Sequence, residues 1–233
     1  SMKNFSFSNL KNFRYERKFR LEGISAKDIE SILKLHPAIF KEIYYERRVN
    51  NIYLDSVDLR SFFDNINGIS KRLKVRIRWY KDTFGFIKEP VLELKLKHNL
   101  HVGKLNYSLV PFMMDKSFSI NTIRRVFEQS SLPERLKFHL EELSFSLLNS
   151  YRRRYFLSAD KKYRITLDYD LEAYKLLPRY NSFLYKFKKQ NTTVIELKYN
   201  EPNNIFADEI TNYFSFRLVR SSKYVDGITS LYK

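Results

Sequence analysis

Hydrophobic and polar residues alternate along several short segments of this chain, which is the period of a β-strand with two different faces. In one such segment Val75, Ile77 and Trp79 alternate with cationic residues. Turn-forming and helix-capping residues separate the segments from one another. The alternation predicts strands at 14–22, 49–55, 72–81, 86–98, 102–110, 151–158, 162–172 and 192–199.

A helical period replaces the alternation between these strands. Ser25 is placed to cap the first helix and Pro37 to end it, while Pro133 suits a first helical position. The predicted helices are 26–35, 58–66, 119–130, 133–149 and 204–213, with a last short helix after Ser222. This order of elements predicts an α+β fold: a closed antiparallel β-barrel of about eight strands with helices packed on the outside.

The length of 233 residues suits one domain, and 43% hydrophobic residues are enough for a packed core. We therefore expect a single domain over 1–233, with Ser1-Met2 as a cloning remnant and 3–12 as an N-terminal segment. No apolar run approaches the ~20 residues that span a bilayer, and no secretory signal is visible. The absence of cysteine excludes thiolate chemistry and fits a reducing compartment. We expect a cytoplasmic protein, with attachment to the inner face of a membrane through a partner as the open alternative.

The formal net charge of +17 predicts an anionic partner. Nucleic acid, a membrane surface and a polyanionic small molecule all satisfy this condition. The positions of the charges along the predicted strands are needed to choose among them.

On five predicted strands the polar face consists almost entirely of charged residues, with base exceeding acid. An ordinary solvent-facing side of an antiparallel sheet is the plain explanation for any one of these strands. Such a face usually mixes charges of both signs, and arginine is here unusually prominent, which suits phosphate recognition. If these faces point inward, a polyanion and a metal ion would be needed to balance them. The shared faces include Arg14, Glu16, Lys18 and Arg20; Lys74, Arg76 and Arg78; Glu93, Lys95 and Lys97; Arg164, Thr166, Asp168 and Asp170; and Glu196 and Lys198.

Several segments, in their order along the chain, resemble the VTC domain of the triphosphate tunnel metalloenzymes, also called the CYTH-like superfamily. The likeness is to stand-alone bacterial members. The segments are Arg14-Tyr-Glu-Arg-Lys-Phe19, Tyr53-Leu-Asp55, Lys74-Val-Arg-Ile-Arg78, Leu92-Glu-Leu-Lys95, Tyr151-Arg-Arg-Arg-Tyr155, Arg164-Ile-Thr-Leu-Asp168, Ile195-Glu-Leu-Lys198 and Ser222-Lys-Tyr224.

The resemblance implies a polyphosphate polymerase, which transfers the γ-phosphoryl group of ATP to a polyphosphate chain in a basic tunnel with Mn²⁺ or Mg²⁺. It implies Glu196 and Glu16 as metal ligands, and Tyr151 and Ser222 as hydrogen-bonding groups. Lys97, Lys198 and Asp168 share the expected tunnel face, the two lysines as further substrate-binding residues. The implied phosphate-binding residues are Lys18, Arg76, Arg78, Lys95, Lys104, Arg153, Arg164 and Lys223, and all of these except Lys104 are implied to be catalytic.

One departure from the family pattern separates two activities. Hydrolytic relatives begin with Glu-x-Glu-x-Lys, whereas this chain has Arg14 at the first position, before Glu16 and Lys18. Hydrolysis must activate a water, which usually requires carboxylates and metal, whereas a phosphate acceptor is already ionised. The departure favours polymerase over triphosphatase. Hydrolysis of tripolyphosphate or nucleoside triphosphate, and binding of polyphosphate or inositol polyphosphate without turnover, remain as alternatives.

Other motifs predict little. The chain has no P-loop, no Gly-x-Gly-x-x-Gly and no kinase catalytic loop. His98 and His101 are expected in a surface turn rather than in a metal site. In the triplet 152–154 the alternation predicts that Arg153 points inward and its neighbours outward, and 186–189 is expected to be a solvated basic loop. Most aromatic residues lie opposite the charges and are expected in the core, so we regard nucleic acid as an unlikely partner.

Overall fold

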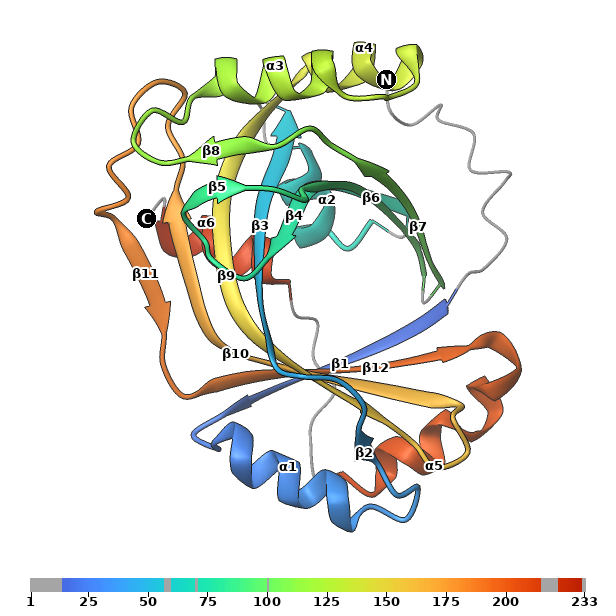
Figure 1. Cartoon of the computed structure of the whole chain (residues 1–233). Coiled ribbons are helices and arrows are strands. Elements are labelled where there is room, and N and C mark those ends of the chain that lie inside the picture. The colour runs from blue at the N-terminus through green and yellow to red at the C-terminus, as the bar shows by residue number, and fades with distance from the viewer. Residues whose placement is uncertain (1–13, 57–59, 70, 100, 215–221, 232–233) are drawn as a thin grey trace.

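The computed structural model describes residues 14–56, 60–69, 71–99, 101–214 and 222–231, and its centre is a closed antiparallel β-barrel (Figure 1). The strands follow one another around the barrel in the order β12-β1-β7-β6-β4-β3-β9-β10, and pairing of β10 with β12 closes it. The predicted barrel is confirmed. Its strands are β1 (Arg14–Glu22), β3 (Arg47–Ser56), β4 (Lys71–Tyr80), β6 (Val91–His98), β7 (His101–Ser108), β9 (Leu143–Leu157), β10 (Tyr163–Lys175) and β12 (Thr192–Asn200).

Four short strands lie beside this barrel. β11 (Lys186–Lys189) pairs with β10, and β2 (Lys41–Glu42) pairs with β9. β5 (Gly85–Ile87) and β8 (Phe112–Met114) pair with each other in a separate two-stranded sheet. The segment 186–189, expected as a loop, is therefore an edge strand, although Lys186 and Lys188 remain exposed as expected.

Helices cover two opposite sides of the barrel (Figure 1). α3 (Ile120–Gln129) and α4 (Glu134–Glu141) lie across one side, and α1 (Ala26–Leu35) and α5 (Ala207–Asn212) lie across the other. α1 begins where the Ser25 side chain accepts a hydrogen bond from the backbone N–H of Asp28 at 3.1 Å. The remaining helices are α2 (Arg60–Ile66), the 3₁₀ helix η2 (Glu201–Phe206) and α6 (Lys223–Leu231). In the described part of the chain, no helix combines the length and the apolar character needed to cross a bilayer.

The apolar sides of the strands point outward and form two separate cores under these helices. Ile52, Ile77 and Leu94 belong to the core beneath α3 and α4. Phe19 and Leu197 belong to the core beneath α1 and α5. Because strand side chains alternate, burying the apolar faces outside directs the charged faces into the barrel.

The helix predicted over 133–149 is wrong beyond residue 142, because β9 begins at Leu143. In this segment Leu148 pairs with Ile52 across the sheet and enters the outer core, so strand pairing overrides the local helical pattern. The strand predicted over 86–98 is also divided, into β5 and β6. Pro90 lies between the two parts and has no N–H to donate to a ladder.

α6 lies against one end of the barrel and packs on residues of its inner face. The Tyr224 ring packs at a tilt against that of Tyr53, with the ring centroids 5.1 Å apart, and Ile228 packs with Leu147 and Ala173. The helix approaches β9 closely because residue 227 is glycine: a Cβ atom there would lie 2.5 Å from Leu147 Cδ2. α6 thereby places Lys223 beside the barrel interior.

Candidate active site

Charged side chains from six elements converge inside the barrel and line a pocket. Eight of the lining residues are cations, and four carboxylates lie among or next to them, namely Glu16, Glu93, Asp168 and Glu196. The interior therefore has an excess of positive charge. The pocket is lined by Lys18, Tyr53, Lys74, Arg76, Arg78, Lys95, Tyr151, Arg153, Glu196, Lys198 and Lys223.

Strand register places like charges beside each other in this pocket. Lys74 on β4 is directly opposite Lys95 on β6, and Lys95 is opposite Lys104 on β7. Like charges in opposing positions destabilise a sheet. A polyanion between these strands would remove the repulsion.

Arg76 and Arg78 on β4 are held by different partners. Arg76 Nε and Nη2 lie 2.7 and 2.6 Å from Glu93 Oε2, so the pair is tightly bound. Burial alone would raise the pKa of Glu93, but Arg76 and Arg78 lower it well below its usual range. Arg78 donates from Nε to Asn51 Oδ1 at 2.8 Å and from Nη2 to the Tyr151 hydroxyl at 3.0 Å. Arg78 Nη1 also lies 3.9 Å from Glu93 Oε2, so Arg76 and Arg78 share this one carboxylate and the group keeps a net positive charge.

Arg153 and Lys223 share one buried carboxylate. Arg153 donates to both oxygens of Asp168, at 2.6 and 2.8 Å, and Lys223 Nζ lies 2.7 Å from Asp168 Oδ2. Burial would raise the pKa of Asp168, but the two cations outweigh burial and lower it well below its usual range. Asp168 is therefore ionised and fixes two cations while neutralising only one.

Tyr151 lies between these groups. Its ring is 5.4 Å from the Arg153 guanidinium and 4.8 Å from Lys223 Nζ. Burial would raise the pKa of its hydroxyl, but Arg78, Arg153 and Lys223 together lower it to about 7. The three cations around Tyr151 thus favour the ionised form of its hydroxyl.

Lys74 is surrounded mainly by other cations. Its Nζ donates to the Ser222 hydroxyl at 3.1 Å, and among the described residues no carboxylate lies within ion-pair distance. Burial lowers the pKa of Lys74 well below its usual range, and Lys18, Lys95 and nearby arginines lower it further. Burial and Lys18 likewise lower the pKa of Lys95 to about 8, although Glu16 and Glu196 oppose this change.

Glu16 and Glu196 form a carboxylate pair on neighbouring strands β1 and β12. Burial and mutual repulsion would raise the pKa of Glu16, but Lys95, Lys198 and Lys18 lower it, and the same lysines lower that of Glu196 strongly. Both groups are therefore ionised, as metal ligands must be. Glu196 Oε1 is buried and accepts no hydrogen bond from the residues described. These properties fit a divalent cation.

The pair cannot surround a metal ion by itself. The described residues contain no group of three or more His, Asp and Glu side chains that could hold a metal. Mg²⁺ is typically bound by one or two carboxylates together with water and substrate phosphates. The donor set therefore fits an ion that is held jointly by the protein and a phosphate chain.

The remaining predicted residues lie nearer the edges of the pocket. Arg164 is opposite Lys198 and is exposed, and Lys104 is also exposed beside Lys95. Lys97 is half-buried, and burial lowers its pKa to about 8. Ser222 is buried at the base of α6 against Lys74. His98 is exposed as the last residue of β6, next to the β6–β7 turn rather than within it.

Two lining residues were not among the predicted site residues. Lys74 belongs to the same face as Arg76 and Arg78, so the alternation already indicated its position. Tyr53 lies opposite Arg76 on β3 and also contacts α6. Its position could have been obtained from the same alternation, since Asn51 and Asp55 share its face.

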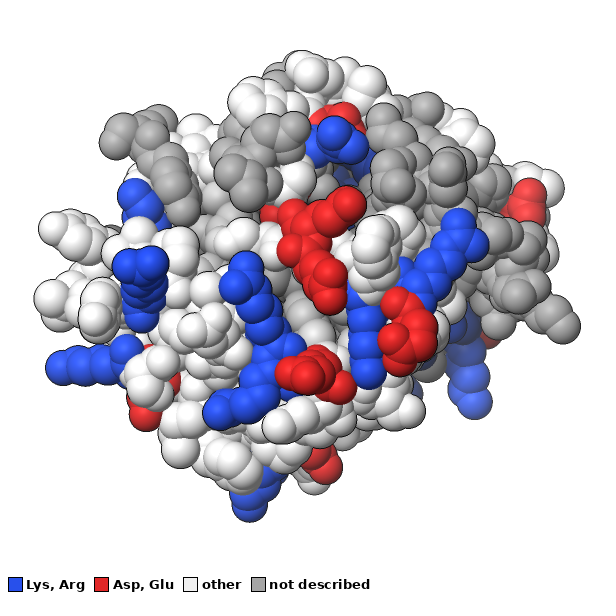
Figure 2. Space-filling model, turned by 90° about the horizontal axis from the view of Figure 1, so that it is seen from above, with Lys and Arg blue, Asp and Glu red and all other residues white. Residues whose placement is uncertain are grey.

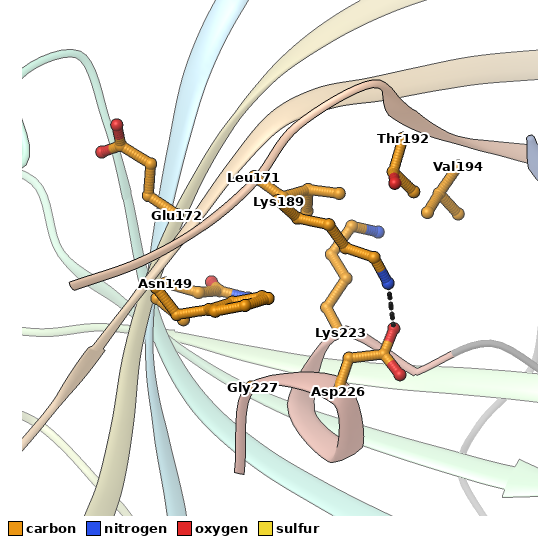
Figure 3. A pocket seen from close by; sticks show the side chains of 11 residues that line it. Asn149, Leu171, Glu172, Lys189, Thr192, Val194, Lys223, Asp226 and Gly227 are labelled. Carbon is orange, nitrogen blue, oxygen red and sulfur yellow. Dashed lines mark ion pairs between the residues drawn. The ribbon is translucent and has the colours of Figure 1, made fainter. Parts of the chain in front are cut away.

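A smaller pocket lies where α6 meets β10, β11 and β12 (Figure 3). Lys189 and Asp226 face each other across it, with Nζ 3.7 Å from Oδ2. Arg20 also reaches Asp226, at 3.3 Å. Lys223 lines both this pocket and the central one, so α6 connects the two.

Solved structures with the same architecture come from several organisms. A candidate adenylate cyclase from Vibrio parahaemolyticus aligns with a TM-score of 0.53 and 10% identity, covering 94% of this chain and 98% of that one. HpAC1 from Hippeastrum, a candidate adenylyl cyclase for which a dominant triphosphatase activity is described, aligns with a TM-score of 0.52 and 14% identity, covering 94% and 95%. The PH1012 protein from Pyrococcus horikoshii OT3 aligns with a TM-score of 0.51 and 10% identity, covering 92% and 99%. At these identities the likeness shows a shared fold.

Sequence comparison identifies the family. No curated protein shows a significant match to this chain. The profile of the VTC domain, in contrast, matches residues 13–232. Because this match extends over nearly the whole sequence and the tunnel fold agrees with it, the chain belongs to the VTC domain family.

Proposed function

We propose that this domain is a metal-dependent polyphosphate polymerase, which transfers the γ-phosphoryl group of ATP to the end of a polyphosphate chain. The observation that supports this most directly is the excess of cations over carboxylates inside a closed barrel. A linear polyanion is a ligand that could neutralise such an interior. The proposal includes Mn²⁺ or Mg²⁺ at Glu16 and Glu196.

The proposed reaction is an in-line transfer. An oxygen of the terminal phosphate of the acceptor attacks the γ-phosphorus, the bond from that phosphorus to the β–γ bridging oxygen breaks, and ADP leaves. The cations hold both chains in line, and Arg78 and Arg153 are fixed by partners that leave them facing the pocket. A bound divalent ion would neutralise charge on the phosphates. Lys18, Arg76, Lys95, Arg164 and Lys223 complete the set of groups that we assign to phosphate binding and catalysis.

The acceptor needs no general base, because a terminal phosphate is already ionised. Hydrolysis would instead require a group that orients and activates water. Arg14, which stands where hydrolytic relatives have a carboxylate, is exposed at the start of β1 and is opposite Asn200. This position supports phosphoryl transfer over hydrolysis.

Triphosphate hydrolysis is the second candidate, since HpAC1, which shares this fold, is described as having a dominant triphosphatase activity. Nucleic acid is a poorer candidate for the ligand. On the face shown in Figure 2, basic side chains are interspersed with acidic ones instead of forming one continuous basic field. A duplex would meet charges of both signs there.

The test is incubation of the protein with ATP and Mn²⁺, followed by electrophoresis of polyphosphate and quantification of ADP and orthophosphate. Polymerase activity gives ADP and a growing polyphosphate ladder, with little orthophosphate. Orthophosphate release without a ladder would select hydrolysis. Tight binding of tripolyphosphate with neither product would select a binding module and contradict the proposal.

A further inference from the structure

A group of tyrosines surrounds one arginine at the end of the barrel away from α6. The Arg47 guanidinium lies 4.7 Å from the ring of Tyr44, 4.1 Å from that of Tyr80 and 4.9 Å from that of Tyr155. Tyr45 extends the group, with its ring 6.3 Å from that of Tyr44. We call these five residues the tyrosine mouth.

Arg47 is held by aromatic groups instead of by acids. It donates from Nε and Nη2 to the Tyr155 hydroxyl, at 3.2 and 2.7 Å. Within the described residues no carboxylate forms an ion pair with it. Its charge therefore remains available to an anion, and the rings around it fix its position.

The tyrosine mouth lies next to the central pocket along strands β3 and β9. Arg47 on β3 is directly opposite Arg153 on β9, and Tyr155 shares a strand face with Arg153 and Tyr151. β3 then runs from Arg47 to Tyr53, where the strand meets α6, a distance of roughly 20 Å for six residues. The barrel thus has an aromatic end and a helix-covered end, with the phosphate pocket between them.

The rings of the mouth are open to ligands. Tyr45 is 86% exposed, Tyr44 54% and Tyr80 40%. Exposed aromatic rings beside a cationic groove are the elements that bind nucleobases, by stacking on any base. Inorganic polyphosphate has no group that would use them.

We propose that the tyrosine mouth holds the base of the nucleotide whose triphosphate occupies the tunnel, with Tyr44 and Tyr45 as stacking surfaces and Arg47 facing its phosphates. This inference rests on the proposed function, because it assigns the aromatic end to the phosphoryl donor. It also gives the tunnel a direction. The nucleoside stays at the tyrosine mouth, and the polyphosphate chain extends toward α6.

The experiment compares three ligands by calorimetry with Mn²⁺ present: ATP, UTP and tripolyphosphate. UTP has the same triphosphate as ATP but a smaller base, and tripolyphosphate has no base. Stacking strengthens binding by roughly 5- to 160-fold per base, so Tyr45→Ala and Tyr44→Ala should each weaken ATP binding by about tenfold. In the same variants the affinity for UTP should fall less than that for ATP, and the affinity for tripolyphosphate should fall by less than twofold. Tyr45→Phe should retain ATP affinity.

The matched control is Tyr180→Ala, since Tyr180 is 82% exposed but lies in the loop next to α3. This change should leave all three affinities as they are. Unchanged ATP binding in both Tyr44→Ala and Tyr45→Ala would overturn the inference, and so would equal weakening of ATP and tripolyphosphate, which indicates a purely structural role. In either case tripolyphosphate binding to the unchanged protein would leave the tunnel proposal standing. If no ligand binds the unchanged protein, both proposals fail.

Discussion

Arg153 and Arg154 are neighbours on β9, yet the structure uses them in opposite ways. Arg154 points outward, where it donates to Glu30 of α1 and to Glu42 of β2, each at 2.7 Å. Two carboxylates thus balance one arginine. Arg153 points inward and shares the single carboxylate of Asp168 with Lys223. The outer arginine joins elements of the fold, whereas the inner one shares its carboxylate with a second cation and faces the central pocket.

The same difference extends to the two faces of the barrel. Outside, Arg17 is matched by Asp208 at 2.5 Å, and Arg152 lies between Glu46 and Asp170. Inside, eight of the residues that line the central pocket are cations and one, Glu196, is a carboxylate. The net charge of +17 therefore does not by itself indicate where a ligand binds. The candidate site is found where cations lack enough neighbouring carboxylates to neutralise them.

The largest expected effect comes from replacing the inner arginine of β9 and comparing the result with replacement of the outer one. Under the proposed polymerase function, Arg153→Met should lower kcat/KM for polymer formation by on the order of 10²- to 10³-fold, because it removes a preorganised charge from the proposed phosphate site. Arg154→Met should change kcat/KM by less than threefold while lowering the melting temperature. Steady-state kinetics with a circular dichroism melt of each variant measures both quantities. Equal loss of activity in the two variants would contradict the distinction between the faces.

A second change tests the carboxylates of the interior. Glu196→Gln should weaken Mn²⁺ binding at least tenfold, which is the size of effect seen for groups that support a metal. Glu93→Gln is the matched control, because Glu93 is bound to Arg76. The measurement is a Mn²⁺ titration followed by electron paramagnetic resonance in the presence of tripolyphosphate. A larger effect from Glu93→Gln would assign the metal elsewhere.

A third change tests whether repulsion between the interior cations destabilises the ligand-free protein. Lys74→Met removes a half-buried amine that lies among cations and beside no carboxylate of the described residues, so the ligand-free protein should melt about 2–4 °C higher for each kcal/mol gained. The same variant should bind tripolyphosphate roughly fivefold more weakly. Opposite signs for stability and affinity are the essential result. A lower melting temperature would show that Lys74 stabilises the empty fold.

The smallest expected effect is a dependence of stability on pH. The pKa values of Lys95 and Lys97 are lowered to about 8, against 10.5 for an ordinary lysine. Between these values the unfolded chain binds protons that the folded protein has lost, so stability rises with pH. Tyr151, with its pKa lowered to about 7 from 10.0, acts in the same direction.

The melting temperature of the empty protein should therefore increase between pH 7 and pH 9, by scanning calorimetry at constant ionic strength. Over the same interval tripolyphosphate should bind more weakly, because the lysines lose the charge that attracts it. A melting temperature that falls with pH in this interval would contradict the lowered pKa values. Lys97→Met should reduce the slope.

The sequence was sufficient for those parts of the site that depend on strand alternation. Alternation alone separated Arg153 from Arg154, because a one-residue step on a strand reverses the face. The helix predicted over 133–149 failed beyond residue 142 for a related reason. Residues 143–149 belong to β9, whose register is set by pairing with β3. Because β3 is distant in sequence, local periodicity contains no information about that partner.

The tyrosine mouth could not be predicted in this way. Tyr44 and Tyr45 precede β3 in an irregular segment, and Arg47 lies before the predicted strand 49–55. Their proximity to Tyr80 and Tyr155 arises only when the barrel closes and brings the start of β3 next to the ends of β4 and β9. The stacked arginine is therefore a property of the tertiary structure.

The pairing of β1 with β12 has a consequence for how the molecule is made. The nine residues of β1, from Arg14 to Glu22, pair with residues between Thr192 and Asn200. The first described strand can therefore pair on this side only after one of the last strands has been synthesised. During translation the barrel stays open until that distant segment leaves the ribosome. Asp168 acquires its second cation only when Lys223 follows. A nascent chain thus carries its basic strands unassembled until residues 192–200 have been synthesised.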